Sequence, residues 1–382
     1  MPFKLLEYFN SFEKSITIKK KQHKSAKRIL VCPLNWGLGH ATRCIPIVKE
    51  LELRGAEVVI GGEGESLELL KDEFPDLAFI NLPGYNIDYP KNMGMTTSIA
   101  ISTPKLLYKI YKEHRALKSL MKKWKFDVVI SDNRYGLWNS QAKSIFITHQ
   151  LQVKSTERLQ FLEPILFRVS SFFISKFDLC WVPDFEGPDN LSGDLSHTKT
   201  LSNVRFIGPV SRFAENGNPT KPPLVKRGNR LLVILSGPEP QRTIFEKVIL
   251  KQLRGSSLDI TVIRGILTNT QKKENGIKIH DYLCAKAMKE EIQSADIVLS
   301  RPGYSSIMDL ASIGKRAIFV PTPGQTEQEY LAKMCMAKGM AYSEPQQGFN
   351  LERALKISKN YNGLSAAIDN KQIKEEVKKL VD

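Results

Sequence analysis

The fold is decided by residues 300–309, which read Ser-Arg-Pro-Gly-Tyr-Ser-Ser-Ile-Met-Asp. They follow the apolar run Ile297–Leu299, and the order predicts a buried strand, a glycine-containing turn and a helix opened by Ser305 and Ser306. Free N–H groups at such a helix start favour a bound diphosphate. We expect Asp309 in the first helical turn, within reach of a ribose diol. The alternative is a capping box from Ser306 to Asp309, which uses the same end of the helix.

Similar alternations of strand and helix extend outward from this stretch in both directions. Apolar runs predict strands at 29–32, 57–62, 127–132, 144–149, 230–235, 258–263, 297–300 and 317–321. Between the first two, a helix is predicted from about His40 to Arg54. Strands that alternate with helices form parallel sheets covered on both faces, with ligands at the carboxyl ends of the strands. The predicted fold class is therefore α/β, with two Rossmann-like domains facing each other across a cleft.

A segment rich in Pro, Gly and Asn, Phe213–Gly228, separates the two halves and is predicted to be a linker. The chain then divides into an N-terminal extension (1–28), a first domain (29–212), the linker (213–228), a second domain (229–350) and C-terminal helices that close the fold (351–382).

The composition excludes several classes of protein. The chain has 382 residues and a formal charge of +16, part of which lies in a polybasic run at 19–28. This run is either a solvated, mobile extension or a contact for an anionic membrane surface. No basic platform interleaved with aromatic residues is present, so we expect no nucleic-acid partner.

The cysteines and the apolar runs indicate a cytoplasmic protein. The five cysteines are scattered without metal-ligand spacing, so no disulfide framework and no metal site are expected. No apolar run reaches the roughly 18 residues of a membrane span, and the N-terminus lacks the features of a signal peptide. The predicted location is the cytoplasm. Peripheral attachment to the inner face of the membrane is the alternative that the basic run leaves open.

A second glycine-containing turn follows the first strand in the segment Asn35–Arg43. Gly37 and Gly39 permit close approach of a ligand to the helix start. A dinucleotide-binding fingerprint would need a third glycine at Thr42, so that function is the weaker alternative. His40 lies where substrates bind, and an imidazole suits a general base at neutral pH. The alternative is a histidine that only packs against the turn.

Together these segments resemble the GT-B glycosyltransferases, specifically the family of the bacterial peptidoglycan transferase that adds GlcNAc to a lipid-linked muramyl intermediate. The resemblance covers residues 29–341 and is strongest at 299–332. It implies that His40 is the base that deprotonates the acceptor hydroxyl, and that no cofactor is required besides a UDP-sugar as donor. The implied donor-binding residues are Gly37, Gly39, Ser236, Gly237, Tyr282, Leu283, Gly303, Tyr304, Ser305, Ser306, Asp309, Gln328 and Glu329.

The resemblance assigns a role to each part of the second domain. Gly303 to Ser306 form the diphosphate-binding turn, and Asp309 replaces a ribose-binding glutamate. Tyr282 and the Leu283 amide frame the uracil, and Gln328 with Glu329 contacts the donor sugar. Glu329 departs from the glutamine of the family and leaves the sugar open, and Ser236–Gly237 lies in a loop that contains prolines the family lacks.

The acceptor side of the first domain resembles the family least. Asn35, Trp36 and the stretch Pro83–Tyr89 differ from its pattern, so the muramyl acceptor is not carried over. Asp132 is predicted either to orient His40 or to form a strand-end turn. His149 is a candidate for the acceptor cleft.

The sequence thus predicts an inverting hexosyltransferase that moves a sugar from a UDP-sugar to a glycan or lipid-linked acceptor, in cell-envelope or polysaccharide synthesis. Motion about the linker is expected to close the cleft. The alternatives are a UDP-sugar epimerase of the same fold and a non-catalytic sugar-nucleotide-binding protein. The apolar helix Phe161–Phe173 is either buried or meets a lipid-linked acceptor or the bilayer.

Overall fold

The computed structural model describes residues 26–84, 95–199, 201–214, 228–268, 270–274 and 276–382. Three of the predicted segments fall wholly or mostly elsewhere. The N-terminal extension up to residue 25, the acceptor-side stretch from Tyr85 onward and the linker at 215–227 lie outside the described residues.

The first domain is built on a seven-stranded sheet of the described residues, in the order β3-β2-β1-β4-β5-β6-β7. All of its strand pairs are parallel. The strands are β1 (Arg28–Pro33), β2 (Glu57–Gly62), β3 (Ala78–Asn81), β4 (Val128–Asp132), β5 (Lys143–Ile147), β6 (Leu179–Val182) and β7 (Val204–Phe206). The helices are α2 (Leu38–Leu53), α3 (Gly64–Glu73), α4 (Met95–Trp124), η2 (Glu157–Leu162), α5 (Glu163–Ile174) and α6 (Asp194–His197).

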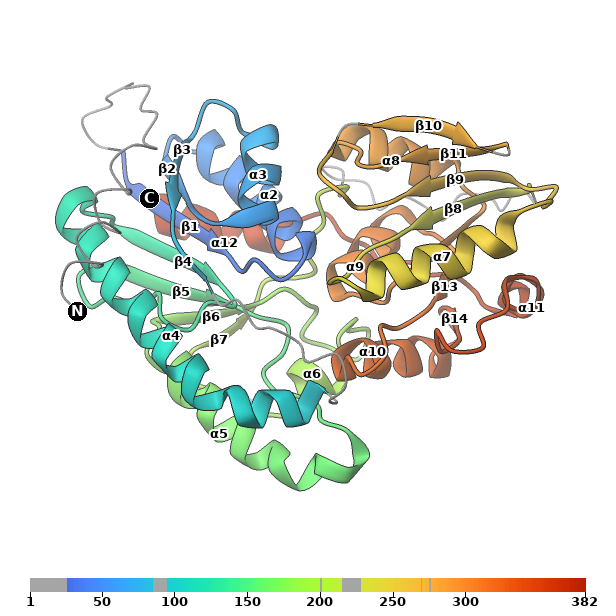
Figure 1. Ribbon diagram of the computed structural model, residues 1–382. Helices are drawn as coiled ribbons and strands as arrows, with labels where there is room; N and C mark the ends of the chain where they lie inside the picture. The colour runs from blue at the N-terminus through green and yellow to red at the C-terminus, as the bar shows by residue number, and fades with distance from the viewer. Residues whose placement is uncertain (1–25, 85–94, 200, 215–227, 269, 275) are drawn as a thin grey trace, which may run out of the picture.

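The second domain repeats this build with the order β10-β11-β9-β8-β12-β13-β14. The strands are β8 (Arg230–Ile234), β9 (Asp259–Ile263), β10 (Gln271–Glu274), β11 (Ile277–His280), β12 (Ile297–Ser300), β13 (Ala317–Phe319) and β14 (Tyr342–Ser343), and only the β10–β11 pair is antiparallel. The helices are α7 (Gln241–Leu253), α8 (Ala285–Ser294), α9 (Tyr304–Ile313), α10 (Thr326–Ala337), α11 (Leu351–Ile357), η3 (Ser358–Asn360) and α12 (Lys371–Val381). The predicted fold class is confirmed, since the two sheet domains lie side by side (Figure 1).

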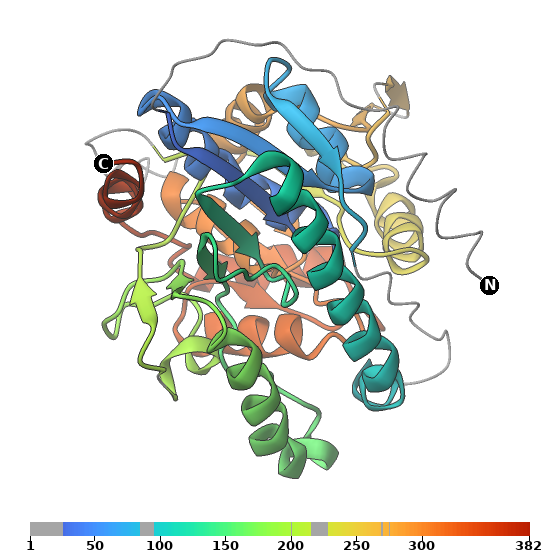
Figure 2. The same cartoon turned by 90° about the vertical axis from the view of Figure 1, so that its left-hand side faces the viewer.

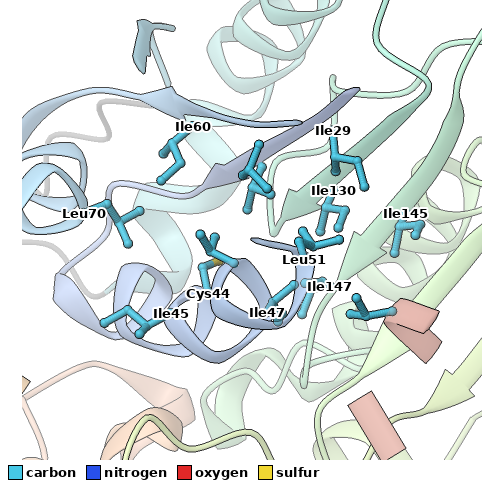
Figure 3. Packing of buried hydrophobic residues seen from close by; sticks show 14 of the residues in the cluster. Ile29, Cys44, Ile45, Ile47, Leu51, Ile60, Leu70, Ile130, Ile145 and Ile147 are labelled. Atoms are coloured by element: carbon cyan, nitrogen blue, oxygen red, sulfur yellow. The ribbon is translucent and has the colours of Figure 1, made fainter. Parts of the chain in front are cut away.

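The core of the first domain lies between its sheet and helix α2. Figure 3 shows Cys44, Ile47 and Leu51 of α2 pointing toward strand residues such as Ile29 and Ile130. All five side chains are buried. Apolar residues on one side of α2 therefore dock it on the sheet, and this sets the position of its N-terminal turn at the carboxyl end of β1.

The last helix, α12, returns from the second domain to the first (Figure 1). Its buried residues Ile373, Val377 and Leu380 belong to the same apolar cluster as α2. The chain thus crosses between the domains twice. Within the described part of these crossings, the Asn370 amide bonds to both backbone groups of Ser211, with distances of 3.3 and 3.0 Å.

The two domains also share an apolar core of their own. Leu191 and Leu195 of the first domain pack in one cluster with Ile307, Met308 and Leu331 of the second. Free motion between domains is expected only where the interface is small and polar. This interface holds the two carboxyl edges of the sheets together.

Candidate active site

The N-terminal turns of α2 and α9 meet where the two domains contact each other. Ser305 Oγ donates a hydrogen bond of 2.8 Å to the main-chain carbonyl of Gly39. A Cβ added to Gly39 would lie 3.2 Å from Ser305 Oγ, so the glycine permits this close approach of the two turns. Gly37 is the N-cap of α2, with φ of 79°, a backbone conformation that favours glycine.

His40 lies in this turn and contacts a buried carboxylate. Its Nδ1 is 2.9 Å from Asp132 Oδ1 at the end of β4. The same Nδ1 is 2.9 Å from an Arg43 nitrogen. Arg43 also bonds both carboxylate oxygens of Asp132, through Nε at 2.5 Å and through a second nitrogen. The side chain of Asp132 therefore faces His40, and its predicted role as an orienting group is compatible with the geometry.

The surroundings of His40 favour its neutral form. Burial lowers the pKa of His40 below its ordinary value of 6.5, against the opposing charge of Asp132, while Arg43 and His149 lower it further. Burial alone would raise the pKa of Asp132, but Arg43 and then His40 hold that pKa well below its usual range. At neutral pH the pair is thus a neutral imidazole next to an ionised carboxylate, as a general base requires.

His149 connects this group to the second domain. Its Nδ1 is 3.0 Å from an Arg43 nitrogen and its Nε2 is 2.8 Å from Glu327 Oε1 at the start of α10. Its ring stacks on the ring of Tyr304, with centroids 4.3 Å apart. Because a guanidinium only donates, Nδ1 must accept, and Nε2–H must donate to Glu327.

The helix of the predicted donor motif begins one residue earlier than expected. Helix α9 begins at Tyr304 with Gly303 as N-cap and without a side-chain cap bond. The predicted capping box from Ser306 to Asp309 is therefore wrong, and Asp309 lies in the second turn instead of the first. The Tyr304 side chain is buried, and its hydroxyl donates a hydrogen bond of 2.8 Å to the carbonyl of Pro183. Only the backbone of Tyr304 is therefore left to contribute to the free N–H groups of the turn.

Asp309 is held by the segment that leaves the first domain. It accepts hydrogen bonds from Ser211 Oγ at 2.7 Å and from Arg212 Nε at 3.2 Å. Burial raises the pKa of Asp309, while Arg212 and Ser211 oppose that rise. In this conformation the carboxylate bonds protein groups at the place where the resemblance puts a ribose.

The other predicted donor residues line the carboxyl edge of the second sheet. Tyr282 follows β11 and packs partly against the apolar cluster of the first domain, and burial raises its pKa to about 12. Leu283 packs against the shared core. Gln328 accepts from the Thr322 amide at 2.9 Å, and Glu329 accepts from the Gly324 amide at 3.0 Å. These two side chains thus support the loop after β13, on the predicted sugar side.

Several polar atoms at this edge have no partner in the described structure. They are Ser300 Oγ, Thr322 Oγ1 and Gln325 Oε1, each shielded from solvent. Gly237, with φ of 106°, lies beside Thr322, since its Cβ would be 3.6 Å from Oγ1. Ser236 precedes it in the loop after β8. Buried polar atoms are normally satisfied, so this group is suited to hydrogen bonding with a polar ligand.

Sequence reasoning missed three charged residues of the site: Arg43, Arg212 and Glu327. For Arg43 a signal existed, because residues three apart on a helix share a face and His40 precedes it by three. Arg212 and Glu327 carried no such signal, because their partners are distant in the sequence. No group of three or more His, Cys, Asp or Glu side chains within the described ranges is arranged to hold a metal ion. In the same part of the chain, no helix is long and apolar enough to cross a bilayer.

Comparisons with known proteins agree with this arrangement. Residues 239–381 match the glycosyltransferase family 28 C-terminal domain. A protein of Methanosarcina acetivorans named as an uncharacterized glycosyltransferase is 24% identical over 348 residues, which are 84% of this chain and 87% of that protein. The UDP-N-acetylglucosamine--N-acetylmuramyl-(pentapeptide) pyrophosphoryl-undecaprenol N-acetylglucosamine transferase of Buchnera aphidicola is 23% identical over 357 residues, 88% of this chain and 90% of that protein.

Solved structures show the same fold. The glycosyltransferase SnogD from Streptomyces nogalater aligns with a TM-score of 0.58 at 12% identity, covering 93% of this chain and 99% of that one. MurG of Acinetobacter baumannii aligns with a TM-score of 0.50 at 14% identity, covering 93% and 94%. With the family match at residues 239–381, these findings show that the chain has the GT-B fold of glycosyltransferases and that its C-terminal part is a glycosyltransferase family 28 domain.

Proposed function

We propose that this protein transfers a sugar from a UDP-sugar to the hydroxyl group of a lipid-linked acceptor, with inversion at the anomeric carbon. One observation carries the proposal. The turn that holds His40 and the turn predicted to hold the diphosphate touch each other, through the Ser305–Gly39 hydrogen bond of 2.8 Å. A base and a leaving-group site therefore lie next to each other where the two domains meet.

His40 is the proposed base. His40 Nδ1 lies 2.9 Å from both Asp132 Oδ1 and an Arg43 nitrogen, and it can hydrogen-bond only one of them. In the tautomer that a base requires, Nδ1–H is donated to Asp132, Arg43 acts on the ring through its charge, and the Nε2 lone pair accepts the proton of an acceptor hydroxyl. The hydroxyl oxygen then forms a bond to the anomeric carbon while the bond from that carbon to the diphosphate oxygen breaks. The bonding electrons leave with UDP, and the proton stays on His40.

The leaving diphosphate is stabilised by the main-chain N–H groups of two converging helix starts. The N-terminal turns of α2 and α9 both carry partial positive charge at this point. Arg212 supplies a full positive charge beside Asp309. This arrangement supports transfer without an obligatory metal ion.

The donor nucleotide is proposed to be a UDP-sugar. Tyr282 offers an aromatic face for the uracil, and Asp309 a carboxylate for the ribose diol once Ser211 and Arg212 give way. The Buchnera relative is named for UDP-N-acetylglucosamine as donor. We therefore place UDP-N-acetylglucosamine or a related UDP-sugar first among the donors, with Gln328 and Glu329 next to the sugar.

The lipid-linked nature of the acceptor is supported by an exposed apolar face on α4, η2 and α5. Phe161 is 70% exposed, Phe172 is 57% exposed, and Ile165 and Val169 continue the same side of the helix. Leu107 and Tyr108 of α4 are exposed as well. The two helices extend together from the first domain (Figure 2). The explanation of this helix as simply buried does not hold, since its large side chains reach solvent.

Basic side chains surround this apolar face. Lys176 lies 4.6 Å from the ring centroid of Phe172, Lys199 lies 4.4 Å from that of Phe167, and Lys112 lies 5.0 Å from that of Tyr108. Exposed aromatic residues next to cations fit an anionic lipid surface. Since only the loop 150–156 separates His149, just after β5, from η2, a bilayer bound here would present lipid-linked acceptors near the proposed base.

A transfer assay tests the proposal. The full chain is incubated with radiolabelled UDP-N-acetylglucosamine, and in parallel with other UDP-sugars, in the presence of polyprenyl-diphosphate-linked acceptors. We expect label in the lipid fraction and stoichiometric release of UDP, both lost in His40→Ala. Release of UDP with an epimerised sugar and no acceptor product would indicate the epimerase, and UDP-sugar binding without turnover would indicate a binding protein; either result overturns the proposal.

A further inference from the structure

Arg43 occupies a position in the site that neither the fold nor the donor motif accounts for. It projects from α2 one turn after His40, and its side chain is almost fully buried. Its guanidinium bonds both oxygens of Asp132 and also reaches a ring nitrogen of each of two histidines, His40 at 2.9 Å and His149 at 3.0 Å. A guanidinium is suited to this, because its donors lie in one plane and it keeps its charge.

The charges of this group decide the protonation state of the base. Asp132 is fully buried, and a lone buried carboxylate 2.9 Å from an imidazole would hold a proton on the ring. A protonated His40 cannot accept the proton of an acceptor. The positive charge of Arg43 offsets the negative charge of Asp132. The His40 ring therefore keeps its contact with Asp132, while the carboxylate favours protonation of the ring less strongly.

The remaining charged and titratable groups around His40 do not replace this effect. From α2 itself, Cys44 contacts Asp132 at 3.7 Å as a weak donor. From the loop after β5, His149 accepts a hydrogen bond from Arg43 through Nδ1. From α10, Glu327 is bonded to His149 and adds negative charge, which would favour protonation of His40. Arg43 is the cation of the described site that bonds directly to Asp132.

We infer that Arg43 is a positioning residue that keeps His40 unprotonated at neutral pH by neutralising Asp132, while Asp132 keeps the imidazole in the orientation of a base. This inference rests on the proposed role of His40 as the base. The lowered pKa of His40 is consistent with it. The inference concerns the proton on His40, so it can be measured without any turnover.

The test is an NMR titration of the six histidines in the full chain, with the His40 signal assigned from its loss in His40→Gln. In Arg43→Met we expect the pKa of His40 to rise by about one unit or more, a tenfold change in proton affinity. Arg43→Lys keeps the charge and should recover much of the wild-type value. The double variant Arg43→Met/Asp132→Asn lacks both charges and should return the pKa to the wild-type value or below it.

Arg54→Met is the matched control, because Arg54 ends the same helix and pairs with Glu50 at 2.7 Å, away from the cleft. It should leave the His40 pKa unchanged. An unchanged or lower His40 pKa in a folded Arg43→Met variant would overturn the inference, even if activity were lost. Where transfer activity is measured, the fall of kcat/KM on the acid side of its pH profile should move to higher pH in Arg43→Met. The activity of this variant should recover in alkaline buffer. A loss that is equal at all pH values would assign Arg43 a purely structural role.

Discussion

His149 Nε2 in the first domain and Glu327 Oε1 in the second are 2.8 Å apart, and this hydrogen bond joins the two domains next to the proposed base. The His149 side chain is nearly buried, and that of Glu327 is 25% exposed. Because Arg43 occupies Nδ1 of the same ring, the bond has one direction, from His149 to Glu327. The contact therefore couples the relative position of the domains to the charges around His40.

Removal of this contact should weaken domain docking in a pH-dependent way. Burial alone would raise the pKa of Glu327, but His149 holds that pKa below its ordinary value of 4.5. A lowered pKa in the folded state stabilises the fold above pH 4.5, and this contribution is lost as the pH falls through the lowered value. Glu327→Ala should cost about 1 kcal/mol at pH 7 in denaturant unfolding, and the cost should shrink as the pH falls below 4.5 and through the lowered pKa. Glu327→Gln retains an acceptor and should cost less, whereas a deficit independent of pH would contradict this explanation.

Loss of the proposed base should affect turnover and not donor binding. His40→Ala should lower kcat by about 10²–10⁴-fold, the usual contribution of general base catalysis. Since burial lowers the pKa of His40 below 6.5, wild-type kcat/KM should be level at neutral pH and decline only in more acidic buffer. The variant should lack this acid limb while UDP still raises its melting temperature. A variant with wild-type turnover would remove His40 from the mechanism.

Asp309 should read the ribose hydroxyls of the donor. Binding of UDP and of 2′,3′-dideoxy-UDP is compared by calorimetry in the wild type and in Asp309→Ala. The wild type should prefer UDP by about tenfold or more, the value of hydrogen bonds to a charged group, and the variant should bind both ligands equally. Ser211→Ala serves as a control that removes one of the two present partners of Asp309, leaves Arg212 in place and retains the carboxylate. Persistent discrimination in Asp309→Ala would place the ribose elsewhere.

The exposed apolar face should bind anionic vesicles. Phe161→Ser/Phe172→Ser should lower co-sedimentation with vesicles that contain phosphatidylglycerol by about tenfold or more, since each exposed aromatic contributes burial energy of the order of 1–3 kcal/mol. Ile244→Ser on α7 of the second domain is the matched control, because Ile244 is an exposed apolar residue outside this face. Equal binding by all three proteins, or none by the wild type, would exclude this face as the membrane contact.

The returning helix α12 should stabilise the first domain. Leu380 is buried in the cluster with α2, so Leu380→Ala should lower the free energy of unfolding by about 2–4 kcal/mol. Leu53→Ala at the end of α2 is the control, because that side chain is 81% exposed and its loss should cost little. Similar small costs for both variants would mean that α12 does not belong to the core of the first domain.

Local patterns of the chain predicted much of the fold. The strand expected at 297–300 coincides with β12, Ile297–Ser300, because a continuous apolar run flanked by a proline and glycine turn has few other solutions. Two local predictions were less accurate. Helix α2 begins at Leu38 instead of about His40, and α9 begins at Tyr304, which moves Asp309 into the second turn. Helix ends are set by caps, and at both of these starts the cap is a glycine without a side-chain bond.

For the candidate site, too, local patterns predicted some features and the tertiary structure decided the others. The sequence by itself determined the α/β class and the strand-turn-helix units, since these depend on patterns within short segments. It also placed His40 and Ser305 in the turns after their strands and Asp309 in the helix that follows. The tertiary structure decided their neighbours. Arg43 meets Asp132 because β4 pairs with β1, Glu327 meets His149 because the domains are docked, and Asp309 is held by Ser211 because the crossing segment packs on α9. Contacts between residues about 90 or more positions apart depend on strand order and domain packing, which no local pattern encodes.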